Sequence, residues 1–297
     1  MMIPYPSPRK SSGGGNSGPV RVRKRYFPIG TGGATFVAHT ESAVTSKAAL
    51  IAEIQAIDPT IPATAIGQEF LAIGGGGNGG VGVGATGGLG GGTKFVEIML
   101  SEVSDGDIAI EIGAGASAGS PAPGAGAATS VIDGSTEICA ASGGFGGVAE
   151  GQTPTADEVY SLAVSNNADY PNPMSTGSFF GGPASASGSG CGGRLPTSTE
   201  MWPDPMGMGV FYQSGGTACN AEPWRVYGGF GSGAAGSPCD DTVFRSCGGG
   251  GASNSSGDGG DGGDGGGGGG AGGDGFLGGA GGNGRLRRRP FAWESVA

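Results

Sequence analysis

Glycine is the feature that most limits what this chain can fold into, because it fills 72 of the 297 positions. It is gathered in blocks over residues 74–92, 113–127 and 248–284, and a further block begins at Gly143. Glycine has no Cβ and loses more backbone freedom on ordering than any other residue. Such blocks are therefore either flexible linkers or segments that many backbone hydrogen bonds hold in place.

A period of three favours ordered segments. The triplets are GGN-GGV at 76–81, GGF-GGV at 143–148, GGD-GGD at 259–264 and GGA-GGN at 278–283. Three residues per turn is the polyproline II geometry, which makes no internal hydrogen bonds and leaves its N–H and C=O groups free for neighbours. Several such glycine helices can therefore stack side by side. Collagen is excluded because it needs glycine at every third residue over long spans. Linkers between one or two folded domains remain the alternative.

Short conventional elements lie between the glycine blocks. Apolar spacing over 42–57 predicts a helix that ends before Asp58-Pro59, and 69–73 predicts a strand. Alternation predicts β-hairpins over 93–112 and 128–141, and the basic segment near residue 21 has the pattern of one strand. We therefore expect a mainly β and irregular fold. It has short β-hairpins, a stacked polyglycine II helix bundle and one short N-terminal helix.

Composition divides the chain into four parts. Residues 1–28 are a basic anchoring arm and 29–73 a small α/β connector. Residues 74–284 form the glycine-rich polyglycine II/β domain, with aromatic loops at 145–230, and 285–297 are a basic C-terminal tail.

Basic residues are concentrated at the two ends. The span 26–284 holds five basic and 24 acidic residues, for a net charge of −19, within a chain whose net charge is −10. Such a body repels nucleic acid, so we expect no nucleic-acid partner as a main function. For the basic ends, contact with nucleic acid and docking on an acidic protein are both open, and we expect docking. The candidate docking residues are Arg21, Arg23, Lys24 and Arg25.

The loops at 145–230 are the richest in aromatic residues. Two interpretations stay open: the rings form a small local core, or several are exposed and contact a ligand. The candidate receptor contacts are Phe179, Phe180, Trp202, Phe211, Tyr212, Trp224, Tyr227 and Phe230.

No catalytic set, cofactor motif or metal site is evident, so we expect neither an enzyme nor a cofactor or metal. His39 is the only histidine, and no glycine run continues as a phosphate-binding loop. Acidic residues recur in the last glycine block, but they lack the apolar residues of a calcium-binding repeat. The cysteines form no CxxC pair, and small buried thiols or a disulfide such as Cys239–Cys247 are both possible. The chain begins without a secretory signal pattern, and no stretch is typical of a membrane helix.

The order of strands and glycine runs resembles the glycine-rich domain of bacteriophage tail fibres and distal adhesins. The matching residues are 70–77, 95–98, 110–115, 140–147 and the closing block 248–284. The resemblance implies stacked polyglycine II helices as a rigid tip, with variable loops that contact the host receptor. It also implies a place at the end of a virion fibre, assembly in the host cytoplasm and a homotrimer.

The resulting expectation is a tail fibre or tail-tip adhesin of a virion. Its loops at 145–230 would bind a host surface glycan or outer-membrane protein, and its basic ends would bind other virion tail proteins. The alternative is a head spike, decoration or fibre-base protein with a purely structural role. A glycine-rich matrix or ice-binding protein is a third interpretation. It needs regular flat Thr/Ala faces, which are not evident in this sequence.

Overall fold

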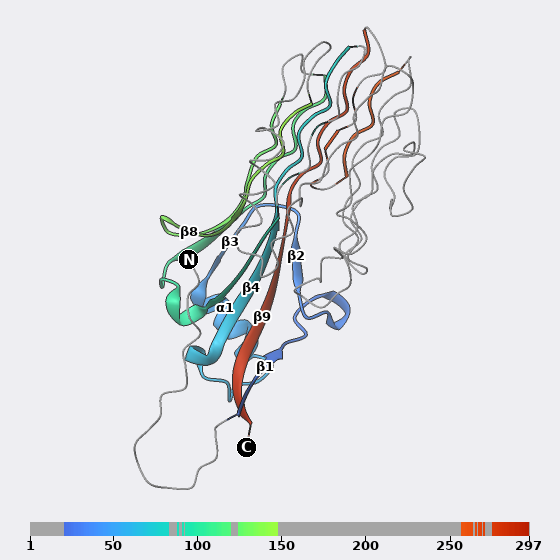
Figure 1. Ribbon diagram of the computed structural model, residues 1–297. Coiled ribbons are helices and arrows are strands. Elements are labelled where there is room, and N and C mark those ends of the chain that lie inside the picture. The colour runs from blue at the N-terminus through green and yellow to red at the C-terminus, as the bar shows by residue number, and fades with distance from the viewer. Residues whose placement is uncertain are drawn as a thin grey trace, which may run out of the picture.

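The computed structural model describes residues 21–82, 93–119, 124–147, 257–263 and 275–296, together with the single positions 88, 91, 265, 267, 268 and 270. The described part is mostly antiparallel β-sheet with one α-helix, as the sequence predicts. Two sheets occupy one end of the molecule, and glycine-rich tracts run from them toward the other end (Figure 1).

The first sheet has five strands around a long C-terminal strand. Its order is β1-β9-β4-β5, and β2 also pairs with β9. The pairs are all antiparallel. The strands are β1 (Arg21–Tyr26), β2 (Val37–His39), β4 (Ile66–Ile73), β5 (Thr93–Met99) and β9 (Arg285–Val296).

Strand β9 corrects the expectation of a basic C-terminal tail at 285–297. It lies between β4 on one side and β1 and β2 on the other, and Leu286, Phe291 and Ala292 are fully buried. Its four arginines lie in the first half of the strand, at 285 and 287–289, and have contacts inside the fold. The predicted strand near residue 21 is confirmed as β1, with β9 as its partner.

The second sheet has four strands in the order β3-β6-β7-β8. The hairpin predicted over 128–141 is confirmed by β7 and β8, and Gly134 supplies the left-handed turn with φ of +60°. The strands are β3 (Ala43–Ser46), β6 (Asp107–Glu111), β7 (Thr129–Asp133) and β8 (Thr136–Ala141).

The hairpin predicted over 93–112 is wrong. Both strands exist, but β5 pairs with β4 in the first sheet while β6 pairs with β3 and β7 in the second. The 3₁₀ helix η3 (Leu100–Glu102) joins them, and Leu100 is buried in the core. Alternation of apolar and polar residues predicts a strand but does not identify the strand that pairs with it. The segment between β5 and β6 therefore has the pattern of a hairpin turn, although it connects the two sheets.

The one α-helix of the described residues is shorter than predicted. Helix α1 covers Lys47–Gln55, and Ser46 caps it by accepting a hydrogen bond from Ala49 N at 3.2 Å. Leu50 and Ile54 are its buried residues. The preceding segment is strand β3, which suits its β-branched residues. Two further 3₁₀ helices are η1 (Thr31–Gly33) and η2 (Ala63–Ala65).

One hydrophobic core lies between the sheets and under α1. It combines Phe70 and Ile66 of β4 with Ile108 and Ile110 of β6, and with Val131 of β7. Cys139 of β8 is also buried, and burial raises the pKa of its thiol to about 12. The prediction of a small buried thiol is therefore confirmed for Cys139, while the other cysteines lie outside the described residues.

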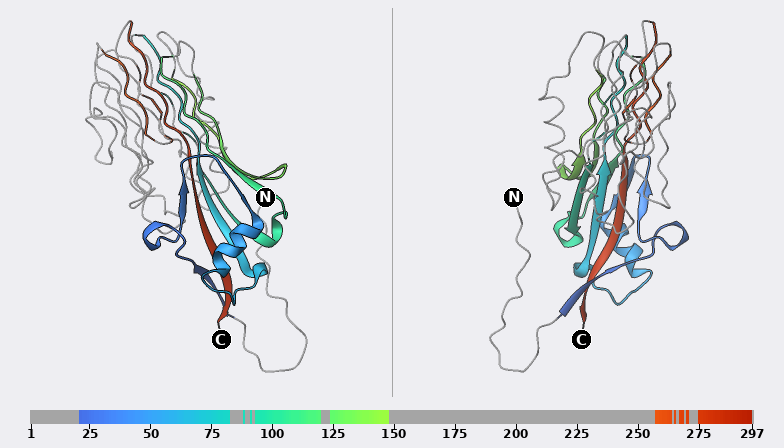
Figure 2. Two further views of the ribbon diagram at one scale, coloured as in Figure 1. Left: turned by 180° about the vertical axis from the view of Figure 1, so that it is seen from behind. Right: turned by 45° about the vertical axis from the view of Figure 1, so that its right-hand side comes forward.

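The glycine-rich tracts are direct continuations of strands. Tract 74–82 follows β4, tract 112–119 follows β6 and tract 142–147 follows β8, whereas tracts 124–128 and 276–284 lead into β7 and β9. Both views of Figure 2 show the tracts leaving the sheets together. The sheets therefore set the spacing and direction of the tracts.

Backbone hydrogen bonds connect these tracts at intervals of three residues. Gly76 N and Gly79 N donate to Gly282 O and Gly279 O, each at 2.8 Å. The same interval recurs in a second pair of tracts. The backbone N–H groups of residues 259, 262 and 265 donate to the carbonyl oxygens of residues 277, 280 and 283, respectively. Residues 74–80, which we call the central tract, are buried throughout. The central tract bonds to tracts 112–119, 124–128, 142–147 and 276–284 and to Gly268.

Side-chain oxygens add a second set of bonds between tracts. Asn78 Oδ1 accepts from Gly124 N at 2.7 Å, and Asn283 Oδ1 accepts from Gly115 N at 3.0 Å. Asp258 Oδ1 and Asp261 Oδ1 accept from Leu277 N at 2.8 Å and Ala280 N at 2.7 Å. Asn78, Asn283 and Asp261 each end a GGN or GGD triplet, so the third residue of these triplets bonds to the backbone of a neighbouring tract, a role that the sequence pattern did not reveal.

Candidate functional site

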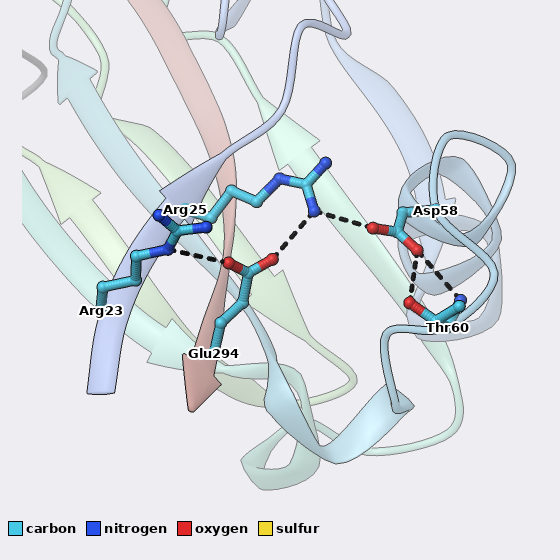
Figure 3. Close-up of polar contacts among 5 residues, drawn as sticks. All are labelled: Arg23, Arg25, Asp58, Thr60 and Glu294. Carbon is cyan, nitrogen blue, oxygen red and sulfur yellow. Dashed lines mark hydrogen bonds and ion pairs between the residues drawn. The ribbon is translucent and has the colours of Figure 1, made fainter. Parts of the chain in front are cut away.

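Strand β1 carries the docking residues predicted from the sequence, and the structure gives most of them partners within the chain. Arg23 Nε lies 3.1 Å from Glu294 Oε2 of β9. Arg25 NH1 lies 2.9 Å from Glu294 Oε1 and 2.7 Å from Asp58 Oδ2 (Figure 3). Asp58 also accepts hydrogen bonds from Thr60 N and Oγ1. This network, the Glu294 network, ties β1 to β9 and to the loop after α1.

The Glu294 network shifts the ionisation of its members. Hydrogen bonds from Arg25 and Arg23 lower the pKa of Glu294. Hydrogen bonds from Thr60 and Arg25 lower the pKa of Asp58. The side chain of Arg23 remains 67% exposed, so it is more open to a second protein than that of Lys24, at 17%, or Arg25, at 38%. Arg21 pairs through its backbone with Val296.

Acidification is expected to weaken the attachment of β1. Glu294 and Asp58 have lowered pKa values in the folded chain, so their stabilising effect is present near neutral pH. It is lost as the pH falls through the lowered values. Denaturant unfolding from pH 7 to pH 3 should show that Glu294→Gln is less stable than the parent at pH 7 and loses less stability on acidification. Equal losses in the two proteins would contradict this assignment.

A second cluster, the Lys24 cluster, lies on the face of the first sheet that points away from the core. Lys24 Nζ lies 2.5 Å from Glu69 Oε1 of β4 and also contacts Glu97 Oε2 of β5. Tyr26 OH lies 3.1 Å from the same Glu69 oxygen, and Arg289 Nε lies 2.7 Å from Glu69 Oε2. Glu69 is 1% exposed, so its charge depends on these partners.

Aromatic rings surround the Lys24 cluster. Lys24 Nζ lies 4.1 Å from the ring centre of Phe291, 5.7 Å from that of Trp293 and 5.6 Å from that of Tyr26. Arg289 stacks over Tyr26 at 4.0 Å. Burial lowers the pKa of Lys24, but hydrogen bonds with Glu69 and Glu97 outweigh it, so that the pKa is raised overall.

The other arginines of β9 also have internal contacts. Arg288 forms a bidentate pair with Glu53 of α1 at 2.7 and 2.9 Å. Arg287 lies over the Phe36 ring at 5.0 Å. His39 is half-buried, and burial together with the charge of Arg288 lowers its pKa. The arginines of β9 therefore connect the first sheet to helix α1 and to Phe36.

The predicted receptor contacts lie outside the described residues, as does most of the aromatic segment 145–230. The acidic partners Glu69, Glu97 and Glu294 were missed by sequence reasoning. A lone Glu inside the apolar run of β4 was the available signal, because a buried carboxylate needs a cationic partner.

Comparison with protein-family models and with curated proteins finds no match to this chain. No helix in the described part of the chain has the length and hydropathy to cross a membrane. Within the same residues, no three potential metal ligands lie together.

Proposed function

We propose that this protein is a bacteriophage virion component, a tail fibre or tail-tip adhesin built on a bundle of stacked polyglycine II helices. The observation that carries the proposal is the bonding of the central tract to tracts on several sides at intervals of three residues. Three residues per turn is the period of a polyglycine II helix, and each bond contributes about 0.5–1.5 kcal/mol.

The close approach of backbones supports the same proposal. A Cβ added at Gly75, Gly126 or Gly281 would overlap a backbone oxygen of a neighbouring tract. Side-chain-free tracts can therefore lie closer together than ordinary strands of two stacked sheets. Such a bundle is rigid without a large apolar core, which suits a platform that holds loops at the end of a fibre.

The arrangement of the ends gives each part a role. The two sheets hold the paired strands β1 and β9 at one end, and residues 1–20 directly precede β1 in the sequence. We assign docking on other virion tail proteins to this end, with exposed Arg23 as a contact. We assign binding of a host surface glycan or outer-membrane protein to the loops at 145–230. The protein would act as a non-enzymatic homotrimer.

Electron microscopy of virions labelled with a gold-conjugated antibody against this chain tests the proposal. We expect label at the tail tip or fibre end. Label on the head would contradict the proposal and support the alternative of a head spike or decoration protein. Particles that carry the chain in mass spectrometry but show label only at the tail base would favour a fibre-base protein, and particles without the chain would contradict a virion role.

A further inference from the structure

Two glutamates face each other directly across neighbouring strands. Glu69 of β4 and Glu97 of β5 are register partners, so their side chains project from the same face of the sheet. Like charges in directly opposite positions are destabilising. Lys24 offsets this repulsion by reaching both carboxylates from β1, across β9.

Lys24, Glu69 and Glu97 form a triad that is largely shielded from solvent. The Glu69 side chain is 2% exposed and the Lys24 side chain 17% exposed, whereas that of Glu97 is 30% exposed. Phe291 lies against the Lys24 ammonium, and Tyr26 and Trp293 lie nearby. Burial disfavours the charged ammonium, whereas the hydrogen bonds to Glu69 and Glu97 raise the pKa of Lys24 overall, so the amine becomes neutral only when its proton passes to a carboxylate.

We propose that Lys24 and Glu97 form an intramolecular amide bond, with Glu69 as the group that transfers the proton. Arg289 and Tyr26 fix the orientation of Glu69, while Glu97 has no such second partner among the described residues. Glu69 is therefore fixed in position to transfer protons, and Glu97 is the carboxyl group that reacts.

The step is a condensation that needs no co-reactant. A first proton passes from the Lys24 ammonium through Glu69 to the Glu97 carboxylate, so that the neutral Nζ attacks Cδ of a neutral carboxyl group. A bond forms between Nζ and Cδ. A second proton passes from Nζ through Glu69 to the Glu97 hydroxyl oxygen, the C–O bond to that oxygen breaks, and water leaves while Glu69 ends as a carboxylate. Holding the groups in contact replaces the high concentration that the reaction needs in solution.

The charges of the cluster favour the product. Before the reaction, Lys24 and Arg289 face Glu69 and Glu97. Afterwards the amide is neutral, and Arg289 still pairs with Glu69 at 2.7 Å. One buried ion pair and one like-charge contact are removed, and no charge is left without a partner. The bond would tie β1, at one side of the sheet, to β5 at the other side.

Intact-mass spectrometry of the purified full-length chain tests the bond, and it does not depend on the proposed function. We expect a mass about 18 Da below the sequence value, one water lost per bond formed. Digestion should give one peptide pair joined through Lys24 and Glu97. A folded wild-type chain at its full sequence mass, after incubation for days at neutral pH, would overturn the proposal.

Variants assign the roles. Lys24→Arg keeps the positive charge but cannot form the amide, so it should have its full mass, as should Glu69→Gln. Glu97→Gln should still react, with a loss of about 17 Da because ammonia leaves instead of water. Circular dichroism verifies that each variant is folded. A loss of mass that persists in Lys24→Arg would place the bond elsewhere and contradict the assignment.

Discussion

Alanine at Gly281 is expected to destabilise the protein by about 3 kcal/mol or more, because the added Cβ overlaps Gly76 O of the central tract. Gly126→Ala should behave alike, since its Cβ overlaps Gly75 O. The overlapping atoms are backbone, which cannot rotate away as a flexible side chain could. Urea unfolding monitored by far-ultraviolet circular dichroism measures the change.

The central tract cannot shift to make room without losing bonds on its other sides. Gly75 N donates to Ala127 O at 2.9 Å, and Gly79 N donates to Gly279 O at 2.8 Å. Each lost bond removes about 0.5–1.5 kcal/mol. The effect of one methyl group is therefore expected to spread over several tracts.

Gly106→Ala is the matched control for these variants. Its added Cβ would meet only Ser104 Oγ at 3.5 Å, and its φ is not positive. We expect its stability to change by less than about 1 kcal/mol, with a small gain possible from the stiffer unfolded chain. If Gly281→Ala and Gly126→Ala unfolded at the same urea concentration as Gly106→Ala, close backbone packing of the tracts would be contradicted.

A chain that stops after Gly284 is expected not to fold. It lacks β9, so β1, β2 and β4 lose their common partner. Leu286, Phe291 and Ala292, all fully buried, are removed from the core and its opposite face. Each large buried apolar side chain contributes about 1.5–3 kcal/mol, against a total stability of about 5–15 kcal/mol for a domain. Thermal unfolding should show no cooperative transition.

Removal of residues 1–20 is the control, because these residues precede β1 and leave the sheet complete. That variant should unfold cooperatively, close to the temperature of the parent chain. Cutting at residue 25 instead would remove Lys24 and Arg25 and leave Glu69 with fewer partners. A cooperative transition in the chain without β9 would show that this strand is dispensable, contrary to its central position.

Local patterns predicted elements well where neighbours in sequence are also neighbours in space. The hairpin of β7 and β8 has its turn at Asp133-Gly134, and helix α1 follows from apolar spacing and the Asp58-Pro59 stop. Pairings between strands that lie far apart in the sequence could not be predicted from local patterns. Strands β5 and β6 were assigned to one hairpin because nothing local records that β5 prefers β4.

Charge was the other source of error. A run of arginines near the end of a chain is typical of a solvated tail, yet Arg288 pairs with Glu53 and Arg289 with Glu69. These partners lie more than 200 residues earlier, so the sequence offers no spacing that links them. Lys24, which was predicted to dock on another protein, contacts Glu69 and Glu97 in the fold, and its docking role stays a prediction.

Hydrogen–deuterium exchange of the central tract tests most directly whether the glycine tracts form an ordered bundle. Gly75, Gly76, Asn78 and Gly79 donate backbone hydrogen bonds to other tracts and are buried. Their amides should exchange as slowly as those of β4, which precedes them. Exchange of these amides at the rate of an unfolded chain, in a protein whose β4 is protected, would contradict the account.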